Sequence, residues 1–247
     1  LISADIVIIH DQGVPTPCHN YAVAIDQGRI THVLPTDEAL ATLEITQHTD
    51  LQDHILIPGL INAHGHTPMS LLRGYSDDKP LQQWLEESIW PVEGEFVSDD
   101  FVRDGSTLAI AEMLLSGTTC FSDMYFFPEV TAATAKNIGI RAQIAFPIFD
   151  FPSAWGNGPD DYISKGLALF DTYKNSDLIH MAFGPHAPYT VGDQALQRVA
   201  MLSNELEAPV HIHLHETENE IATSLTTYSK RPMQRLMDLG LLTARTQ

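Results

Sequence analysis

Residues 55–66 read ILIPGLINAHGH, an apolar run that ends in two histidines, His64 and His66. The run predicts a strand over 57–63 that is buried on both faces, as in a parallel sheet. In an extended segment, residues i and i+2 point to the same side, so the two imidazoles are expected to converge. Convergence of this kind suits a divalent metal, although a polar loop could also hold two histidines by chance. Their position directly after an apolar strand favours the metal site.

Strands and helices alternate through the rest of the chain. This alternation predicts either a (β/α) barrel or an open, doubly wound sheet. No G-x-G-x-x-G motif follows the first strand, which argues against the dinucleotide-binding type. Further strands are expected over 118–124, 140–148, 178–184 and 209–214, and helices over 80–89, 99–115, 128–137, 162–173, 193–206 and, broken around Pro232, 218–239.

Residues 1–56 show a different pattern, with short β segments over 4–9, 22–25 and 30–34 that are separated by turn sequences rich in Gly, Pro and Asp. This pattern predicts a small β domain. It has too few residues for a good core of its own, so we expect it to pack on another part of the protein.

The charge balance argues against several kinds of partner. The 13 Lys and Arg face 32 Asp and Glu, a formal net charge of −19, so neither nucleic acid nor an anionic membrane is expected to bind. No apolar run approaches the roughly 18 residues of a membrane span, and no basic region of a secretory signal opens the chain. Two cysteines, Cys18 and Cys120, cannot form a disulfide framework, which favours a reducing, cytoplasmic compartment.

Histidines also follow the later strands, where a parallel α/β barrel forms its active site. His186 lies between Pro185 and Pro188 and could donate to or accept from a substrate, or be a turn histidine without a role. His213, at the end of the strand over 209–214, is the expected third metal ligand. Its neighbours in the alternation, His211 and His215, cannot bind the same ion as well. We expect His211 to be an interior histidine whose hydrogen bonds are satisfied, and the side chain of His215 to lean outward.

Three acids are candidates for roles around the metal. Glu216, three residues after His213, is predicted to be the general acid/base, because a carboxylate beside a bound metal can move a proton from water to substrate. The alternative is an ordinary acid at a helix N-terminus. Asp123 ends the strand over 118–124 and is expected to be structural, with support of the ligands as the alternative. Glu93, after a helix end, reads as a surface acid from its surroundings alone.

Four segments together resemble the amidohydrolase superfamily, most closely its branch of 5-methylthioadenosine/S-adenosylhomocysteine deaminases, with the related triazine chlorohydrolases. The resemblance runs through the whole chain, and the combination of HxH, PHxPY and HxxE is highly specific. The segments are PGLINAHGHTPMSLLRG at 58–74, WLEESIWPVE at 84–93, FGPHAPYT at 183–190 and HIHLHETENE at 211–220.

The resemblance implies a TIM-type (β/α)8 metal-dependent hydrolase barrel with a flanking small β-sandwich. Residues 1–56 would be the N-terminal part of the sandwich, and 57–247 the N-terminal part of the catalytic barrel. It also implies one divalent metal, most often zinc. The implied site residues are His64, His66 and His213 as metal ligands, Glu216 as proton shuttle, His186 as a substrate contact and Glu93 as the carboxylate that binds the ribose hydroxyls.

The sequence departs from the family pattern in two ways. It carries about five βα units, so the family's metal-site His on strand six and Asp on strand eight are not in it. We therefore interpret it as part of a protein near twice this length and expect it to be inactive alone. In addition, the resemblance places Phe146 at the position where family members that bind a homocysteine carboxylate have Arg. Phe149 and Phe151 follow it. A neutral pocket favours methylthioadenosine over S-adenosylhomocysteine.

The expected function is therefore zinc-dependent hydrolytic deamination of an adenine nucleoside, with the inosine analogue and ammonia as products. One alternative is another amidohydrolase activity, on guanine, cytosine, a cyclic amide or a chlorotriazine. A second is a metal-binding fragment without catalysis. The expected partner is a small nucleoside, and family members often assemble, so the resemblance allows a homo-oligomer.

Overall fold

The computed structural model describes residues 1–247, which divide into two units, Leu1–Gly59 and Leu60–Gln247. The first unit is one mixed sheet in the order β3-β2-β1-β4, in which β1 pairs antiparallel with β2 and parallel with β4. Its hairpin turns place two successive residues at positive φ, as a type I′ turn requires. Its elements are β1 (Ile2–Asp11), β2 (Val14–Asp26), β3 (Arg29–Pro35), α1 (Thr36–Thr42) and β4 (Thr49–Leu56).

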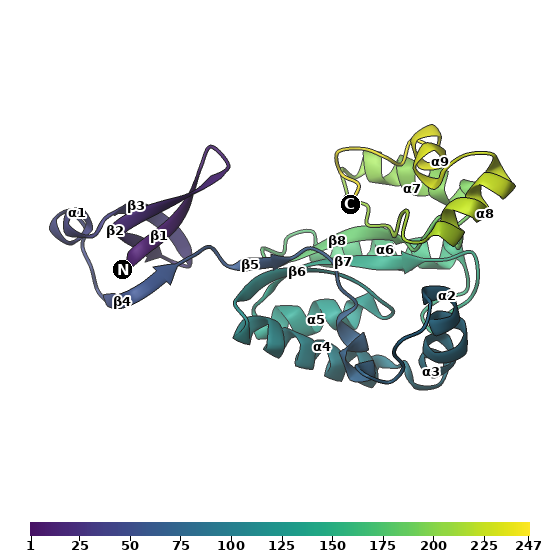
Figure 1. Cartoon of the computed structure of the whole chain (residues 1–247), viewed down its shortest axis with the longest axis horizontal. Coiled ribbons are helices and arrows are strands. Elements are labelled where there is room, and N and C mark those ends of the chain that lie inside the picture. Colours follow the sequence, from purple (N-terminus) through teal and green to yellow (C-terminus); the bar gives the residue numbers. More distant parts are fainter. The chain divides into compact units, whose positions relative to one another are not determined.

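The second unit is built on a parallel sheet of four strands, β5 (Leu60–Asn62), β6 (Thr118–Met124), β7 (Arg141–Ile148) and β8 (Ile179–Pro185), in that order (Figure 1). Helices follow the strands, so the predicted α/β alternation with a parallel sheet is confirmed. The helices are α2 (Leu81–Trp84), α3 (Trp90–Phe96), α4 (Asp99–Leu115), α5 (Pro128–Ile138), α6 (Pro159–Tyr173), α7 (Asp193–Glu205), α8 (Glu218–Tyr228) and α9 (Pro232–Asp238).

The predicted strand over 209–214 is not a regular strand. It is an extended segment beside β8, joined to it by a single bridge between Phe183 and Val210 and by hydrogen bonds from His211 N to Phe183 O and from His213 N to His186 O. On its other side only the last residues, 245–247, bond to it. Without a full neighbour on that side, and with a proline that lacks an N–H at its start, the segment cannot form a complete ladder.

Two other predicted elements have different bounds. The strand expected over 57–63 is only three residues long, and the chain bends at His64. The helix expected over 80–89 continues to Phe96 through α2, a π turn at Leu85–Ile89 and α3. None of the helices is both long enough and apolar enough to span a membrane.

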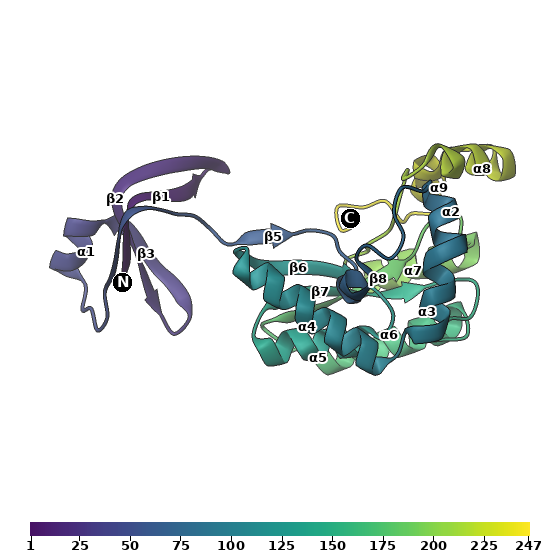
Figure 2. The same ribbon diagram turned by 60° about the horizontal axis from the view of Figure 1, so that its bottom comes forward.

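The main core lies between the sheet and its helices. Phe121, Ile144, Phe146 and Phe183 are fully buried there. Helices α4 and α5 lie side by side along one face of the sheet in both views of the chain (Figure 1, Figure 2). Burial of each large apolar side chain in this core stabilises the folded state by on the order of 2 kcal/mol.

A glycine fixes the approach of α4 to the turn after the first histidine pair. That turn is a 3₁₀ helix, Thr67–Leu72, and a Cβ built on Gly105 would lie 2.4 Å from the carbonyl oxygen of Pro68. Only glycine permits this contact, so the backbone that follows His66 rests directly on α4.

Gly105→Ala is therefore expected to force α4 away from this turn and to destabilise the protein by about 1–3 kcal/mol, the usual cost of overpacking. Gly94→Ala is the matched control, since a Cβ at this helical position meets nothing within 4 Å. The control is expected to be neutral or stabilising by up to about 1 kcal/mol. Urea denaturation of both variants measures the difference, and equal midpoints would contradict the close-packing argument.

Candidate active site

Three imidazoles meet at the carboxyl ends of the strands. His64 and His66 follow β5, and His213 lies in the extended segment after β8. One ligand atom of each lies within 4.8 Å of those of the other two, and the ring centroids are 4.8–5.2 Å apart. The structure thus brings together the three histidines that the sequence singled out as metal ligands.

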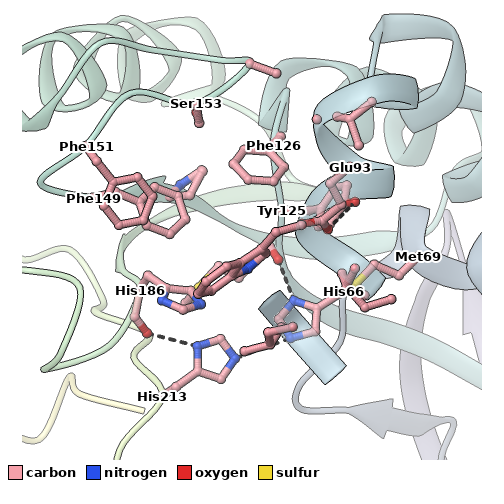
Figure 3. Close-up of a pocket in the computed structure, with 18 of the residues that line it drawn as sticks. His66, Met69, Glu93, Tyr125, Phe126, Phe149, Phe151, Ser153, His186 and His213 are labelled. Atoms are coloured by element: carbon pink, nitrogen blue, oxygen red, sulfur yellow. Dashed lines mark hydrogen bonds between the residues drawn. The ribbon is translucent and has the colours of Figure 1, made fainter. Parts of the chain in front are cut away.

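Backbone carbonyls set the proton positions on two of these rings. His66 Nδ1 lies 2.6 Å from the carbonyl oxygen of Met124, and His213 Nδ1 lies 2.9 Å from that of His186 (Figure 3). A carbonyl oxygen can only accept, so both Nδ1 atoms donate and, in the neutral rings, both Nε2 atoms carry a lone pair. Burial, chiefly, lowers the pKa of His66 to about 4, which keeps this ring neutral at pH 7.

The two Nε2 lone pairs face each other at 3.3 Å. In neutral rings neither atom carries a proton to bridge this gap, so the arrangement is repulsive unless a cation lies between them. Tetrahedral zinc with Zn–N bonds of about 2.0–2.1 Å places neighbouring ligand nitrogens about 3.3 Å apart. The donor set and its spacing therefore fit a divalent metal.

His64 is oriented by a chain of side chains. Its Nδ1 lies 2.7 Å from His211 Nε2, and His211 Nδ1 lies 3.1 Å from Ser122 Oγ. His211 is buried and, as expected, satisfied in the interior. With Nδ1 engaged, Nε2 of His64 is the nitrogen left for an ion.

Asp123, expected to be structural, binds the backbone directly after the pair His64 and His66. It is almost fully buried, and its Oδ1 accepts a hydrogen bond of 2.6 Å from the backbone N–H of Thr67, directly after His66. Its Oδ2 has no partner. Burial raises the pKa of this carboxyl to about 7, which limits the cost of leaving one oxygen unpaired.

A cavity of about 530 Å³ opens from the histidines (Figure 3). His66, His186, His213, Glu93 and Glu216 all line it, so it collects five of the six predicted site residues. His64 is the sixth, and it does not line the cavity. The cavity walls are mostly apolar and contain no Lys or Arg.

His186 lies on the cavity wall between Phe149 and His213, with ring centroids 4.9 and 5.0 Å away. Its Nδ1 pairs with Thr190 Oγ1 at 2.9 Å, so Nε2 is the nitrogen left for the cavity. Burial, with a smaller contribution from His213, lowers the pKa of His186 to about 3. The ring is therefore neutral at pH 7 and can act as a hydrogen-bonding group.

Glu93 is a cavity residue rather than the surface acid that its sequence surroundings suggested. It lies on α3, and its Oε1 accepts a hydrogen bond of 2.6 Å from the hydroxyl of Tyr125. Burial raises the pKa of Glu93 to about 7, and the hydrogen bond from Tyr125 opposes this rise. Tyr125 is not among the residues predicted from the sequence, although its position directly after the end of β6 is a usable signal.

Phe146 does not line the cavity, which corrects the expectation that it shapes the substrate end. It is fully buried beside Phe170 and Phe183, on the helix side of β7. Pro147, the next residue, points to the opposite face and lines the cavity. The apolar character of the cavity comes instead from Phe126, Phe149 and Phe151 and from side chains of α2, the π turn and α3.

Tyr125→Phe is expected to raise the pKa of Glu93 above about 7, because it removes the one hydrogen bond that favours the carboxylate and leaves burial unopposed. Tyr189→Phe, in the same cavity but without a bond to Glu93, should leave this pKa unchanged. A pH titration followed by NMR of ¹³C-labelled glutamate carboxyls measures both. An unchanged or lower pKa in Tyr125→Phe would show that the hydrogen bond does not act on the carboxyl.

Comparison with known proteins places this site in a family. The amidohydrolase family matches residues 55–246. The chain is 55% identical over 226 residues to a 5-methylthioadenosine/S-adenosylhomocysteine deaminase of Saccharophagus degradans, covering 92% of this chain and 51% of that protein. It is 43% identical over 192 residues to a 5'-deoxyadenosine deaminase of Methanoregula boonei, covering 78% and 43%. The chain thus spans about half the length of the curated relatives it matches.

Solved structures agree on the fold. A zinc-bound adenosine deaminase from Xanthomonas campestris superimposes with a TM-score of 0.96 at 45% identity, covering 99% of this chain and 56% of that one. An atrazine chlorohydrolase from Arthrobacter aurescens superimposes with a TM-score of 0.87 at 21% identity, covering 100% and 60%, which shows the fold alone. The expected fold class is confirmed, with about five βα units present. With its family match over residues 55–246, this chain belongs to the amidohydrolase family.

Proposed function

We propose that the complete protein is a zinc-dependent hydrolytic deaminase of adenine nucleosides, with 5'-methylthioadenosine as its main substrate. The products are the inosine analogue and ammonia. The observation that carries the proposal is the cavity that joins two members of the three-histidine cluster, His66 and His213, to a partly buried carboxylate, Glu93, on its wall. The names of the relatives at 55% and 43% identity support the same class of substrate.

We assign His64, His66 and His213 as the ligands of the metal. When bound, a divalent cation supplies the positive charge that lowers the pKa of a coordinating water molecule toward neutrality. The three side chains suit this role because hydrogen bonds made by their Nδ1 atoms fix the rings. Nε2 of each ring is then the nitrogen that remains for the ion.

Glu216 is assigned as the proton shuttle. Its carboxylate takes a proton from the attacking water and delivers it to a nitrogen of the adenine ring, while the water oxygen forms a bond to C6. Glu216 then passes the remaining proton of this water from the C6 hydroxyl to the amino group. The C6–N bond breaks, ammonia leaves, and C6 becomes a carbonyl carbon. His186 holds the purine through its free Nε2.

Glu93 is assigned to the ribose hydroxyls, for which an ionised carboxylate is a strong acceptor. This assignment favours a nucleoside over guanine, cytosine or a chlorotriazine, because these have no ribose for the carboxylate to bind. The missing Lys and Arg in the cavity favour the methylthio group over a zwitterionic amino acid tail, which would lose water without gaining an ionic partner.

The complete zinc-loaded protein is expected to release ammonia from 5'-methylthioadenosine, with kcat/KM about 5- to 150-fold higher than for S-adenosylhomocysteine, since an unpaired polar group costs about 1–3 kcal/mol. Glu216→Gln should lower kcat by about 10²- to 10⁴-fold. Glu218→Gln, an exposed acid of α8, is the matched control and should stay within about twofold. Full activity in Glu216→Gln, or turnover of guanine, cytosine or a chlorotriazine but of no nucleoside, would contradict the proposal.

Zinc is expected to stabilise the folded protein through the histidine cluster. At free zinc of 100 times Kd the gain is about 2.7 kcal/mol, or several degrees in Tm. His213→Ala should abolish the difference in Tm between zinc-loaded and chelator-treated protein. His180→Ala, an exposed histidine of β8, should keep it. A zinc-dependent Tm that survives in His213→Ala would remove this residue from the ligand set.

We also propose that the protein works in the reducing cytoplasm. Cys18 and Cys120 are both free, so neither unit contains a disulfide. Homo-oligomer formation stays a prediction of the resemblance.

A further inference from the structure

The chain makes a sharp turn immediately before Glu216. His215 has φ of +58°, in the left-handed region that a residue with a side chain seldom adopts. The turn ends the extended segment that carries His213, and Glu216 then lines the cavity while α8 begins two residues later. The direction of the Glu216 side chain therefore depends on what holds this turn.

One buried carboxylate, that of Glu220, holds both peptide N–H groups of the turn. Its Oε1 accepts from the N–H of His215 at 3.0 Å, and its Oε2 accepts from that of Glu216 at 2.8 Å. The residue is 3% exposed, and no Lys or Arg forms an ion pair with it. Hydrogen bonds to a charged acceptor in a buried place are the strong kind, so this turn is firmly fixed.

Helix capping alone does not account for this arrangement. The N-cap of α8 is Thr217, whose hydroxyl accepts from the N–H of Glu220 at 3.1 Å. In a capping box the third helical residue would return its carboxylate to the N–H of the N-cap residue. Glu220 reaches past that residue to the two N–H groups before it, which belong to the turn and not to the helix.

We propose that Glu220 is a positioning residue for Glu216: its carboxylate, held on two consecutive N–H groups, fixes the turn that aims the proton shuttle into the cavity. This inference rests on the proposed function of Glu216. Because proton transfer demands that donor and acceptor be placed within a fraction of an ångström, releasing the turn lowers the chemical step more than substrate binding.

The test compares Glu220→Ala and Glu220→Gln with Thr217→Ala, in the complete zinc-loaded protein acting on 5'-methylthioadenosine. Glu220→Ala is expected to lower kcat by about 10- to 100-fold with KM changed by less than about threefold. Glu220→Gln, which keeps one acceptor oxygen, should retain an intermediate kcat and serves if the alanine variant does not fold. Thr217→Ala removes the helix cap and leaves the turn bonds, so its Tm should fall while its kcat stays within about twofold.

A second readout does not depend on activity. Amide hydrogen exchange of the peptide covering 214–217, measured without zinc, should accelerate in Glu220→Ala and Glu220→Gln and much less in Thr217→Ala. The inference is overturned if both Glu220 variants keep wild-type kcat, if Thr217→Ala loses as much kcat as they do, or if exchange over 214–217 is unchanged. If the wild-type protein deaminates no nucleoside, the proposed function is wrong. The exchange measurement would still decide whether Glu220 holds the turn.

Discussion

Two hydrogen bonds from imidazoles to backbone carbonyls are the constraint on which the rest of the site depends. The carbonyl oxygens of Met124 and His186 fix the protons of His66 and His213 on Nδ1. In the neutral rings both Nε2 atoms therefore carry a lone pair, and these two atoms lie 3.3 Å apart. Met124 ends β6, and His186 follows β8 directly, where its carbonyl oxygen also accepts from the backbone N–H of His213. The parallel sheet therefore supplies rigid acceptors at the one edge where the side chains meet.

The cavity combines two kinds of environment. Near the histidines, burial keeps His66 and His186 neutral, which leaves one ring nitrogen of each with a free lone pair. On α3, the same burial works against the charge on Glu93, and the Tyr125 hydroxyl offsets part of that cost. Between them lie aromatic and aliphatic walls without a basic side chain.

Several supports of the site are found behind the cavity lining. Gly105 lets α4 lie against the turn at 67–72, and Asp123 binds the first N–H of that turn. Glu220 does the corresponding work for the turn before α8. In each case a backbone N–H or a close backbone contact, not a side-chain ligand, fixes the residues that face the cavity.

Periodicity and strand-end motifs are local properties of the chain, so the amino-acid sequence predicted the α/β class, the bounds of β6, and the histidines and Glu216 as candidate site residues. Only the tertiary structure shows the spacing of His66 and His213, 147 residues apart, and the hydrogen bonds of Tyr125 to Glu93 and of Glu220 to the turn before α8. It also turned Phe146 away from the cavity. A strand that is apolar on both faces carries no alternation to show which face is which, so only its pairing and packing settle the question.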